Sequence, residues 1–455
     1  MIGAFATATF SYDNFLYITP SFRNDWSSTL PIGDNSFQSY SVGASFVFTE
    51  LMDDSDSFLD YGKLRLSYGS VGKDAPLFST RTFFGGSFVG GDGFIQSVNF
   101  PAYDTVSFER SGVAGNPNLR PESTREFETG VELKMIDNRL KFDFTYYNRL
   151  SEDVILPVDV APTSGFTSRV DNAAEISNKG VEIAAGYRIF DNEDFSWDID
   201  ANWTTYENIV ESLAPGVEQI TLNGFSSTSA VAAVGQPFSA IFGSSFQRDD
   251  AGNVLIGDDG FPIQSSSNSI VGDPTPDWLA GISNSIRYKD ISLTFLFDIR
   301  KGGDIWCGTC GILDYFGTSA RTLNREESRV FEGIVQSTGQ PNTQSVQLFD
   351  TTISENNNFY RRYGFGGTSE ASIYDGSWVR LRELTLSYNF PSRLLENTFI
   401  ESATVSAYGR NLWLSTDYPG VDPETNLTGD SNGYGLDYFN QPNTKSYGLN
   451  LNLNF

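Results

Sequence analysis

The amino-acid sequence predicts an all-β protein, an antiparallel transmembrane β-barrel of which this chain is an incomplete portion of about 13 strands. Along the 455 residues, large apolar residues alternate with polar ones at every second position, the period of a strand with one apolar and one polar face. The linkers alternate between short turns and connections of tens of residues. The composition, with 37 Phe, 21 Tyr and 43 Gly, is typical of strands and turns.

The clearest strand is the last, where Tyr447, Leu449, Leu451, Leu453 and Phe455 alternate with glycine and asparagine. The boundaries of the other segments carry an error of a few residues. In chain order the predicted strands lie near 2–12, 15–25, 38–49, 60–71, 122–136, 139–152, 177–190, 195–208, 278–289, 291–300, 377–390, 402–414 and 446–455.

Linker length assigns each connection to one end of the barrel. If the chain ends in the periplasm, the short turns near 12–14, 50–59, 137–138, 191–194, 289–290 and 391–401 are periplasmic. The long loops near 73–121, 153–176, 209–277, 301–376 and 415–445 then lie outside the cell. Because functional residues concentrate on such loops, we expect them to form the functional surface.

A soluble β-sandwich also alternates, and two details favour the barrel over it. Tryptophans stand near strand ends on apolar faces, as in the aromatic girdle of a membrane barrel: Trp197, Trp203, Trp278, Trp378 and Trp413. The polar faces carry residues suited to a wet lumen: Asp143, Asp198, Asp200, Asn202, Arg287 and Asp298. No apolar run reaches the roughly 18 residues of a membrane-spanning helix, and the first residues do not resemble a signal peptide.

Composition also excludes much chemistry. The chain contains no histidine, which removes Ser-His-Asp triads and His-ligated zinc. The net charge of −27 repels nucleic acid. A glycosidase built on two carboxylates remains an alternative, but no pair stands out among 57 acidic residues. We therefore expect no enzyme, no cofactor and no metal site.

The two cysteines, Cys307 and Cys310, stand in the run WCGTC, which resembles a redox motif. A catalytic site of this kind begins a helix after a buried parallel strand, where the helix lowers the pKa of the first thiol. Here the motif follows a predicted antiparallel strand and enters a long loop. The pattern therefore favours a disulfide in an oxidising compartment over a catalytic dithiol or a metal site.

Two further loop features each have two interpretations. The runs DDAGN at 249–253 and DDGF at 258–261 resemble calcium loops but lack a suitably placed glutamate, so we predict turns. Loop aromatics could stack on sugar rings or simply pack loop against loop: Tyr315, Phe316, Tyr360, Tyr374, Tyr434 and Tyr438.

Several ordered motifs resemble the barrel of SusC/RagA-like TonB-dependent transporters. They are GNPNLRPE at 115–122, NKGVE at 178–182, GGDIW at 302–306, GSWVRLRELTLSY at 376–388, GRNLW at 409–413, YPGVDPE at 418–424 and the terminal Phe455. The resemblance covers nearly the whole chain. It implies a cell outer-membrane barrel of about 22 strands, driven by TonB through an N-terminal box and filled by a plug.

The same resemblance implies import of a glycan or peptide with a SusD-like surface lipoprotein. Residues 1–455 would be the C-terminal part of the barrel, with the plug domain and TonB box upstream of Met1. The final strand resembles the signal read by the barrel-assembly machinery. The alternative from another class is a soluble or surface β-rich carbohydrate-binding protein or adhesin.

Overall fold

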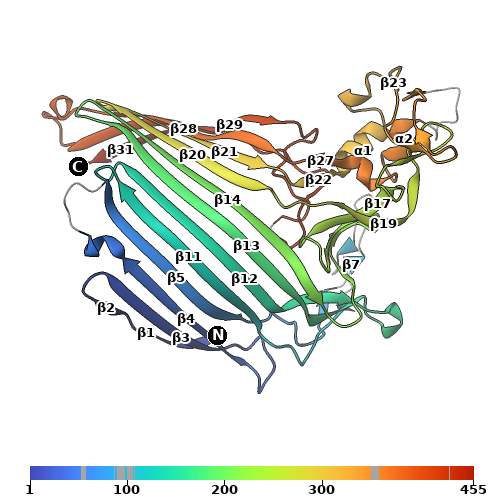
Figure 1. Cartoon of the computed structure of the whole chain (residues 1–455), viewed down its shortest axis with the longest axis horizontal. Helices are drawn as coiled ribbons and strands as arrows, with labels where there is room; N and C mark the ends of the chain where they lie inside the picture. Colours follow the sequence, from blue (N-terminus) through green and yellow to red (C-terminus); the bar gives the residue numbers. More distant parts are fainter. Residues whose placement is uncertain are drawn as a thin grey trace.

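The computed structural model describes residues 1–52, 58–86, 88–89, 98–99, 106, 108–349, 358–429 and 431–455. Strands from nearly the whole length of the chain form one curved antiparallel wall, and most of the smaller elements gather at the end of the strands away from the C-terminus (Figure 1). In the described residues, no helix has the length and hydropathy that a membrane span requires.

Thirteen strands form the continuous path of the wall, and each predicted strand is confirmed. In order along the sheet they are β1 (Ile2–Thr7), β3 (Leu16–Trp26), β4 (Ser36–Val47), β5 (Leu59–Lys73), β11 (Glu122–Met135), β12 (Leu140–Asp159), β13 (Ser168–Asp191), β14 (Phe195–Leu213), β20 (Trp278–Tyr288), β21 (Ile291–Lys301), β28 (Trp378–Asn389), β29 (Ser402–Thr416) and β31 (Ser446–Asn454). The short strand β2 (Phe10–Tyr12) also pairs with β3. Every neighbouring pair on the path is antiparallel, as predicted.

The central strands are longer than predicted. β12, β13 and β14 have 20, 24 and 19 residues, whereas about 9–11 residues cross a bilayer. Their distal halves therefore extend beyond the membrane-spanning wall and carry part of the loop structure. The turn between β11 and β12 is short because Ile136, Asp137 and Asn138 all adopt positive φ (55–60°), a conformation that Asp and Asn tolerate well.

The wall has two chemically different faces. On β5 the apolar side chains Leu64, Leu66 and Tyr68 are 42–49 % exposed. The opposite face carries ion pairs between strands, with Arg65 at 2.6 Å from Asp143. Such alternation suits a wall with lipid on one side and a polar lumen on the other.

A bulge in β28 and β29 moves one predicted girdle residue to the lumen. The pairing passes from Leu381↔Trp413 to Glu383↔Arg410, so one residue of β28 lies opposite two residues of β29. Beyond this bulge, the side chains of β28 that would have faced the lipid face the lumen. Trp378 is 6 % exposed and lies under the guanidinium groups of Arg380 and Arg382. The prediction that Trp378 belongs to a lipid-facing aromatic girdle is therefore wrong.

Small sheets and helices make up the loops. The larger sheets contain β15 (Gln219–Gly224), β16 (Thr228–Ala233), β17 (Ala240–Phe246) and β19 (Gln264–Gly272), and β27 (Ile373–Asp375), β22 (Asp304–Cys307) and β30 (Leu436–Asp437). The shorter strands are β6 (Phe84–Gly86), β7 (Phe88–Val89), β8 (Val98–Asn99), β9 (Phe108–Arg110), β10 (Val113–Ala114), β18 (Leu255–Ile256), β23 (Ser328–Arg329), β24 (Ile334–Val335), β25 (Gln340–Pro341) and β26 (Val346–Gln347). The helices are α1 (Gly308–Tyr315) and α2 (Phe359–Tyr363), with 3-10 turns η1 (Phe48–Leu51), η2 (Pro162–Ser164), η3 (Ala320–Thr322), η5 (Ser369–Ser372) and η6 (Ser392–Leu394).

Tightly buried apolar residues lie in these loops. One cluster joins Ala230, Ile241 and Leu436, each fully buried, from segments about 200 residues apart. Another packs Leu156 and Val210 of the long wall strands against the loop strand β15. The loops therefore pack against one another as an ordered assembly above the wall.

Candidate binding pocket

Four loop segments far apart in the sequence enclose a pocket of about 330 Å³. It is the size of the smaller ligand sites in proteins. Its lining comes from the β15–β16 turn, the β22–α1 corner, the segment from α2 through η5, and the residue after β30. The lining residues are Phe225, Ser226, Ser227, Thr228, Trp306, Gly308, Gly311, Ile312, Gly364, Phe365, Gly366, Gly367, Thr368, Ser369, Ser372 and Tyr438. We call this the aromatic pocket.

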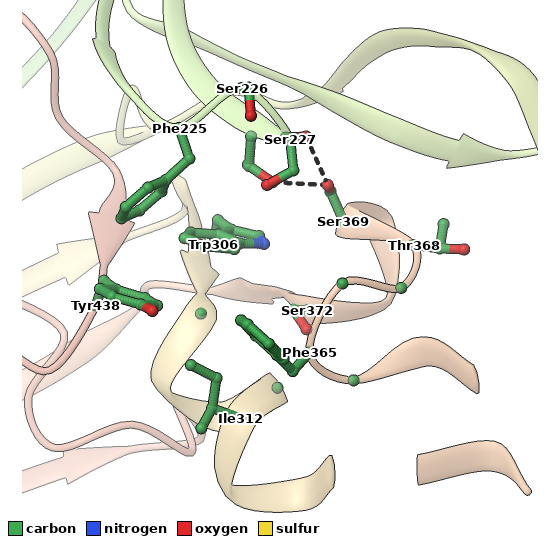
Figure 2. A pocket seen from close by; sticks show the side chains of 16 residues that line it. Phe225, Ser226, Ser227, Trp306, Ile312, Phe365, Thr368, Ser369, Ser372 and Tyr438 are labelled. Carbon is green, nitrogen blue, oxygen red and sulfur yellow. Dashed lines mark hydrogen bonds between the residues drawn. The ribbon is translucent and has the colours of Figure 1, made fainter. Parts of the chain in front are cut away.

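Aromatic rings form one side of the aromatic pocket. The rings of Trp306 and Tyr438 are almost parallel, at an interplanar angle of 7° with centroids 6.4 Å apart. Phe225 completes the group, 4.7 Å from Tyr438 and 5.9 Å from Trp306. Gly308 is required beside them, because a Cβ there would lie 2.4 Å from the indole of Trp306. Figure 2 shows these three rings together, with Phe365 across the space.

Hydroxyl groups form the opposite side. The hydroxyl of Ser369 donates to the carbonyl of Ser227 at 3.1 Å (Figure 2). It also shares hydrogen bonds with the hydroxyls of Thr228 at 2.7 Å and Ser244 at 3.1 Å. This network is buried and ties the β15–β16 turn to η5. It therefore holds the hydroxyl side of the pocket in a fixed geometry.

One hydroxyl of the lining has no protein partner. The Oγ1 atom of Thr368 is inaccessible to solvent and makes no hydrogen bond, in a residue that is 1 % exposed. A buried hydroxyl without a partner is destabilising, and this one points away from the aromatic rings in Figure 2, where a ligand in the pocket cannot reach it. Among the lining residues none carries a charge, in a chain with a net charge of −27.

The run WCGTC lies directly behind the aromatic rings. β22 ends at Cys307 and α1 begins at Gly308, and β22 pairs in parallel with β30. The motif follows the antiparallel strand β21, as predicted, but within the predicted long loop its first residues belong to β22, which pairs antiparallel with β27 as well as in parallel with β30. The sulfur atoms of Cys307 and Cys310 form a disulfide, with Cα atoms 5.2 Å apart. The two residues are 0 % and 3 % exposed. Reactive cysteines are at least partly exposed, so this burial disfavours a catalytic thiol.

A buried carboxylate supports this corner. Asp437 of β30 is fully buried and accepts hydrogen bonds from the hydroxyl of Tyr418 at 2.6 Å and from Thr309 at 3.2 Å. Burial, together with the nearby Asp437 carboxylate, raises the pKa of Tyr418, so that its hydroxyl keeps the proton it donates. Because Tyr438 follows Asp437, this cluster positions the aromatic rings of the pocket.

Of the loop aromatics singled out from the sequence, only Tyr438 lines the aromatic pocket. Tyr360 is buried and its hydroxyl donates to the carbonyl of Arg321. The hydroxyl of Tyr434 donates to the carbonyl of Phe238 at 3.1 Å, and burial raises its pKa to about 12. Phe316 is 66 % exposed.

No pattern in the sequence marks Phe225 or the glycine-rich segment 364–368 as part of a pocket. The runs FSST and GFGGT signal only that these loops contain small residues.

The remaining predicted features lie elsewhere. Asp249 accepts hydrogen bonds from the backbone of Ala251 and Asn253, as a local turn does. In the described residues, no group of three or more Cys, Asp or Glu is arranged to hold a metal ion. The apolar residues of the last strand share one face of β31 or end it, and Phe455 stacks on Phe399. Their role in assembly stays a prediction.

Residues 1–412 match the family described as TonB dependent receptor-like, beta-barrel. Over the whole chain, 26 % of residues are identical to TonB-dependent receptor P3 of Formosa agariphila and 22 % to TonB-dependent receptor SusC of Bacteroides thetaiotaomicron. A solved structure of the RagAB peptide transporter superposes with a TM-score of 0.72 at 23 % identity, over 99 % of this chain.

The wall of two-faced antiparallel strands is therefore that of a β-barrel protein. The chain belongs to the TonB-dependent receptor β-barrel family, and the predicted likeness to SusC/RagA-like transporters is confirmed. It spans 45 % of the length of the Formosa relative, 44 % of SusC and 47 % of the RagAB chain.

Proposed function

We propose that this chain forms part of the wall of an outer-membrane importer that takes up nutrients with energy from TonB. The observation that carries the proposal is the two-faced wall, whose exposed apolar face suits lipid and whose polar face suits a lumen. The ordered loop assembly at one end of the wall suits a surface that meets cargo. The chain belongs to a receptor family and contains no histidine for a histidine-based active site, and both facts support transport over catalysis.

We propose that residues 1–455 are the C-terminal part of the barrel, and that the plug and TonB box belong to sequence outside these residues. The relatives are about twice as long as this chain. In the described residues, β1 and β31 each pair with the wall on one side only. An open edge in lipid leaves backbone groups unpaired at a cost of several kcal/mol each, so further strands would complete the wall.

The cargo of the complete importer is proposed to be a glycan or a peptide, delivered by a SusD-like surface lipoprotein that covers the loops. Support comes from the relatives, since one is a SusC protein and another belongs to a peptide transporter. The barrel-assembly machinery is proposed to insert the complete protein into the outer membrane. The aromatic pocket, within the loop assembly, is the place where we expect cargo to be sampled.

Fractionation and uptake test this proposal on the complete protein. A barrel in the outer membrane is extracted only by detergent and migrates differently on gels before and after heating. We expect uptake of labelled oligosaccharides or peptides to stop in cells that lack TonB and to continue in cells in which the TonB gene is intact. Release of the protein into buffer without detergent would instead support the alternative of a soluble or surface carbohydrate-binding protein.

A further inference from the structure

We propose that residues 417–426, which we call the lumen strap, form a fixed constriction that narrows the lumen at the loop-bearing end of the barrel and limits the size of what can pass. The lumen strap directly follows β29. Its role in import rests on the proposed function, although its position can be measured without transport. Three observations carry the inference: the ion pairs of the strap with the wall, its attachment at a second point, and its exposed side.

Two arginines of β28 hold the lumen strap against the polar face of the wall. Arg380 pairs in register with Asp298 of β21, a residue of that face. The Nη2 atom of Arg380 lies 2.7 and 2.9 Å from the carboxylate oxygens of Asp422. Arg382 lies 2.6 Å from Glu424 and 2.6 Å from Asp298. Because both arginines face the lumen, the segment that carries the two acids lies on the lumen side of the wall.

Three of the motifs found in the sequence meet at this contact. The run at 376–388 contributes the two arginines, and the run at 418–424 contributes the two acids. Asn411, from the run at 409–413, accepts a hydrogen bond from Arg382 at 3.2 Å. These motifs, far apart in the wall and its last long loop, therefore serve one tertiary contact.

Burial makes the inward position of the lumen strap difficult to leave. The side chains of Arg380 and Asp422 are 3 % and 4 % exposed. An outward movement of the strap would separate these buried charges, which is costly. Local hydrogen bonds also shape the strap, because the carboxylate of Asp422 accepts from the backbone N–H of Glu424 at 2.9 Å and its carbonyl accepts from the hydroxyl of Thr425 at 2.8 Å.

The lumen strap is attached to the loop assembly at a second point. The hydroxyl of Tyr418 donates to the buried carboxylate of Asp437 at 2.6 Å. Pro419 and Pro423 each fix one φ angle of the strap, which reduces the freedom of the chain. Because Tyr418 and Asp422 are only four positions apart and both are anchored, the strap is a fixed element and not a mobile loop.

The lumen strap has a wall side and an open side. Asp422 is buried against the wall, whereas Asp417, Pro419 and Val421 are exposed, Val421 by 46 %. A layer packed on the face of a sheet lies about 10 Å from it. The strap therefore fills part of the lumen beside β28, and cargo that passes there meets its open side.

Spin labels test whether the lumen strap is fixed. Val421→Cys and Glu193→Cys are combined in the complete protein and labelled without reductant, and double electron–electron resonance in detergent measures the distance between the labels. Glu193 is the reference, because it lies in the exposed turn between β13 and β14, at the end of the wall away from the loop assembly. We expect one narrow distance distribution. A broad distribution would overturn the proposal.

The same pair of labels tests what holds the strap. Adding Asp422→Asn with Glu424→Gln removes both charges and keeps the side-chain shapes, and we expect the distance distribution to broaden. Lys301→Ala is the matched control, because its ion pair with Asp375 is about half exposed, and we expect no broadening. Heat-modifiable migration shows whether each variant is folded. An unchanged distribution in the folded Asp422→Asn, Glu424→Gln variant would overturn the proposal.

A bulky label tests the constriction without altering the ion pairs, and so decides even if the double variant does not fold. Cells with Val421→Cys are treated with N-ethylmaleimide or with a maleimide that carries a long polyethylene glycol chain, and uptake of labelled oligosaccharides and peptides is followed. We expect the bulky reagent to remove most TonB-dependent uptake and the small one to leave most of it. Leu323→Cys, on a loop residue 79 % exposed and outside the strap, is the control and should tolerate both reagents.

Failure of this inference can be told apart from failure of the proposed function. If uptake depends on TonB but is the same with the small and the bulky label at position 421, the constriction is refuted and the importer stands. If no uptake depends on TonB while the spin labels show a strap fixed by its carboxylates, the importer is refuted and the strap stands as a narrowing of the lumen.

Discussion

The Nη2 atom of Arg380 lies 2.7 and 2.9 Å from the two carboxylate oxygens of Asp422, and the two side chains are 3 % and 4 % exposed. Arg380 belongs to the lumen face of β28, and Asp422 lies in the loop after β29. The pair therefore ties that loop to the wall. The same loop carries Tyr418, whose hydroxyl supports the Asp437 cluster behind the aromatic pocket.

The first prediction concerns this pair. Arg380→Ala leaves the carboxylate of Asp422 buried without its partner, and we expect a loss of about 3–5 kcal/mol in the free energy of unfolding. Lys301→Ala is the control, because the pair of Lys301 with Asp375 spans 3.5 Å and both side chains are about half exposed, so we expect less than about 1 kcal/mol. Urea unfolding of the complete protein measures both, and equal losses would contradict the prediction.

The second prediction tests the two faces of the wall. Phe295 of β21 pairs with Leu384 on the apolar face, whereas Thr294 is on the opposite face. An arginine near the middle of the lipid face costs about 2–4 kcal/mol, and much less on the lumen side. We therefore expect Phe295→Arg to destabilise the folded protein in bilayers and Thr294→Arg to be tolerated. The reverse order would mean that the faces are assigned wrongly.

The third prediction is a pH dependence at Asp314 of α1. Burial raises the pKa of this carboxyl above 3.8, although Arg321 donates to it at 2.7 Å. The folded state thus holds the proton more tightly than the unfolded state, so the stabilisation is full below pH 3.8 and is lost as pH rises through the folded pKa.

The variant Asp314→Asn should therefore be more stable than the natural protein at pH 7. We expect this difference in the free energy of unfolding to shrink as the pH falls toward 3.8. Parallel urea titrations of the two proteins at several pH values measure it, and a difference that does not change with pH would be inconsistent with a raised pKa at Asp314.

The fourth prediction is that Cys307 and Cys310 are bridged in the exported protein. A maleimide added to the denatured complete protein should label no cysteine before reduction and two cysteines after it. Because the closed loop is very short, replacing both residues by serine should cost only about 2 kcal/mol or less. Labelling of two cysteines without reductant would show that the disulfide is absent and does not support the aromatic pocket.

The fifth prediction concerns the end of the chain. Removing Phe455 should reduce the amount of heat-modifiable protein in the outer membrane if the last strand is an assembly signal. Phe399→Ala is the control, because it removes the ring on which Phe455 stacks, with centroids 5.4 Å apart, and leaves the C-terminal residue in place. Normal assembly of the protein without Phe455 would contradict the assembly-signal hypothesis for this residue.

The position of the wall strands was determined by the sequence alone. Alternation in a strand such as β31 is a local property, because successive side chains point to opposite faces whatever the rest of the chain does. The short turns are also local, since Asp137 and Asn138 adopt positive φ at little cost. For these reasons all thirteen wall strands could be placed to within a few residues, apart from the extensions of β12, β13 and β14.

Tertiary pairing decided what strict alternation could not. The bulge that places Trp378 in the lumen depends on how β28 pairs with β29 across a turn, where Asn411 adopts a φ of 53°. The parallel pairing of Cys307 with Asp437 joins residues 130 positions apart. No local sequence pattern predicts either contact.

The aromatic pocket also exists only in three dimensions. Its two sides come from four loop segments that no sequence pattern brings together, and long loops close by burying apolar residues such as Leu436 rather than by a repeating pattern. The sequence by itself therefore determined the wall and the family, because both depend on local periodicity and ordered motifs. Only the folded loops decided which residues meet in the pocket, because that depends on packing between distant segments.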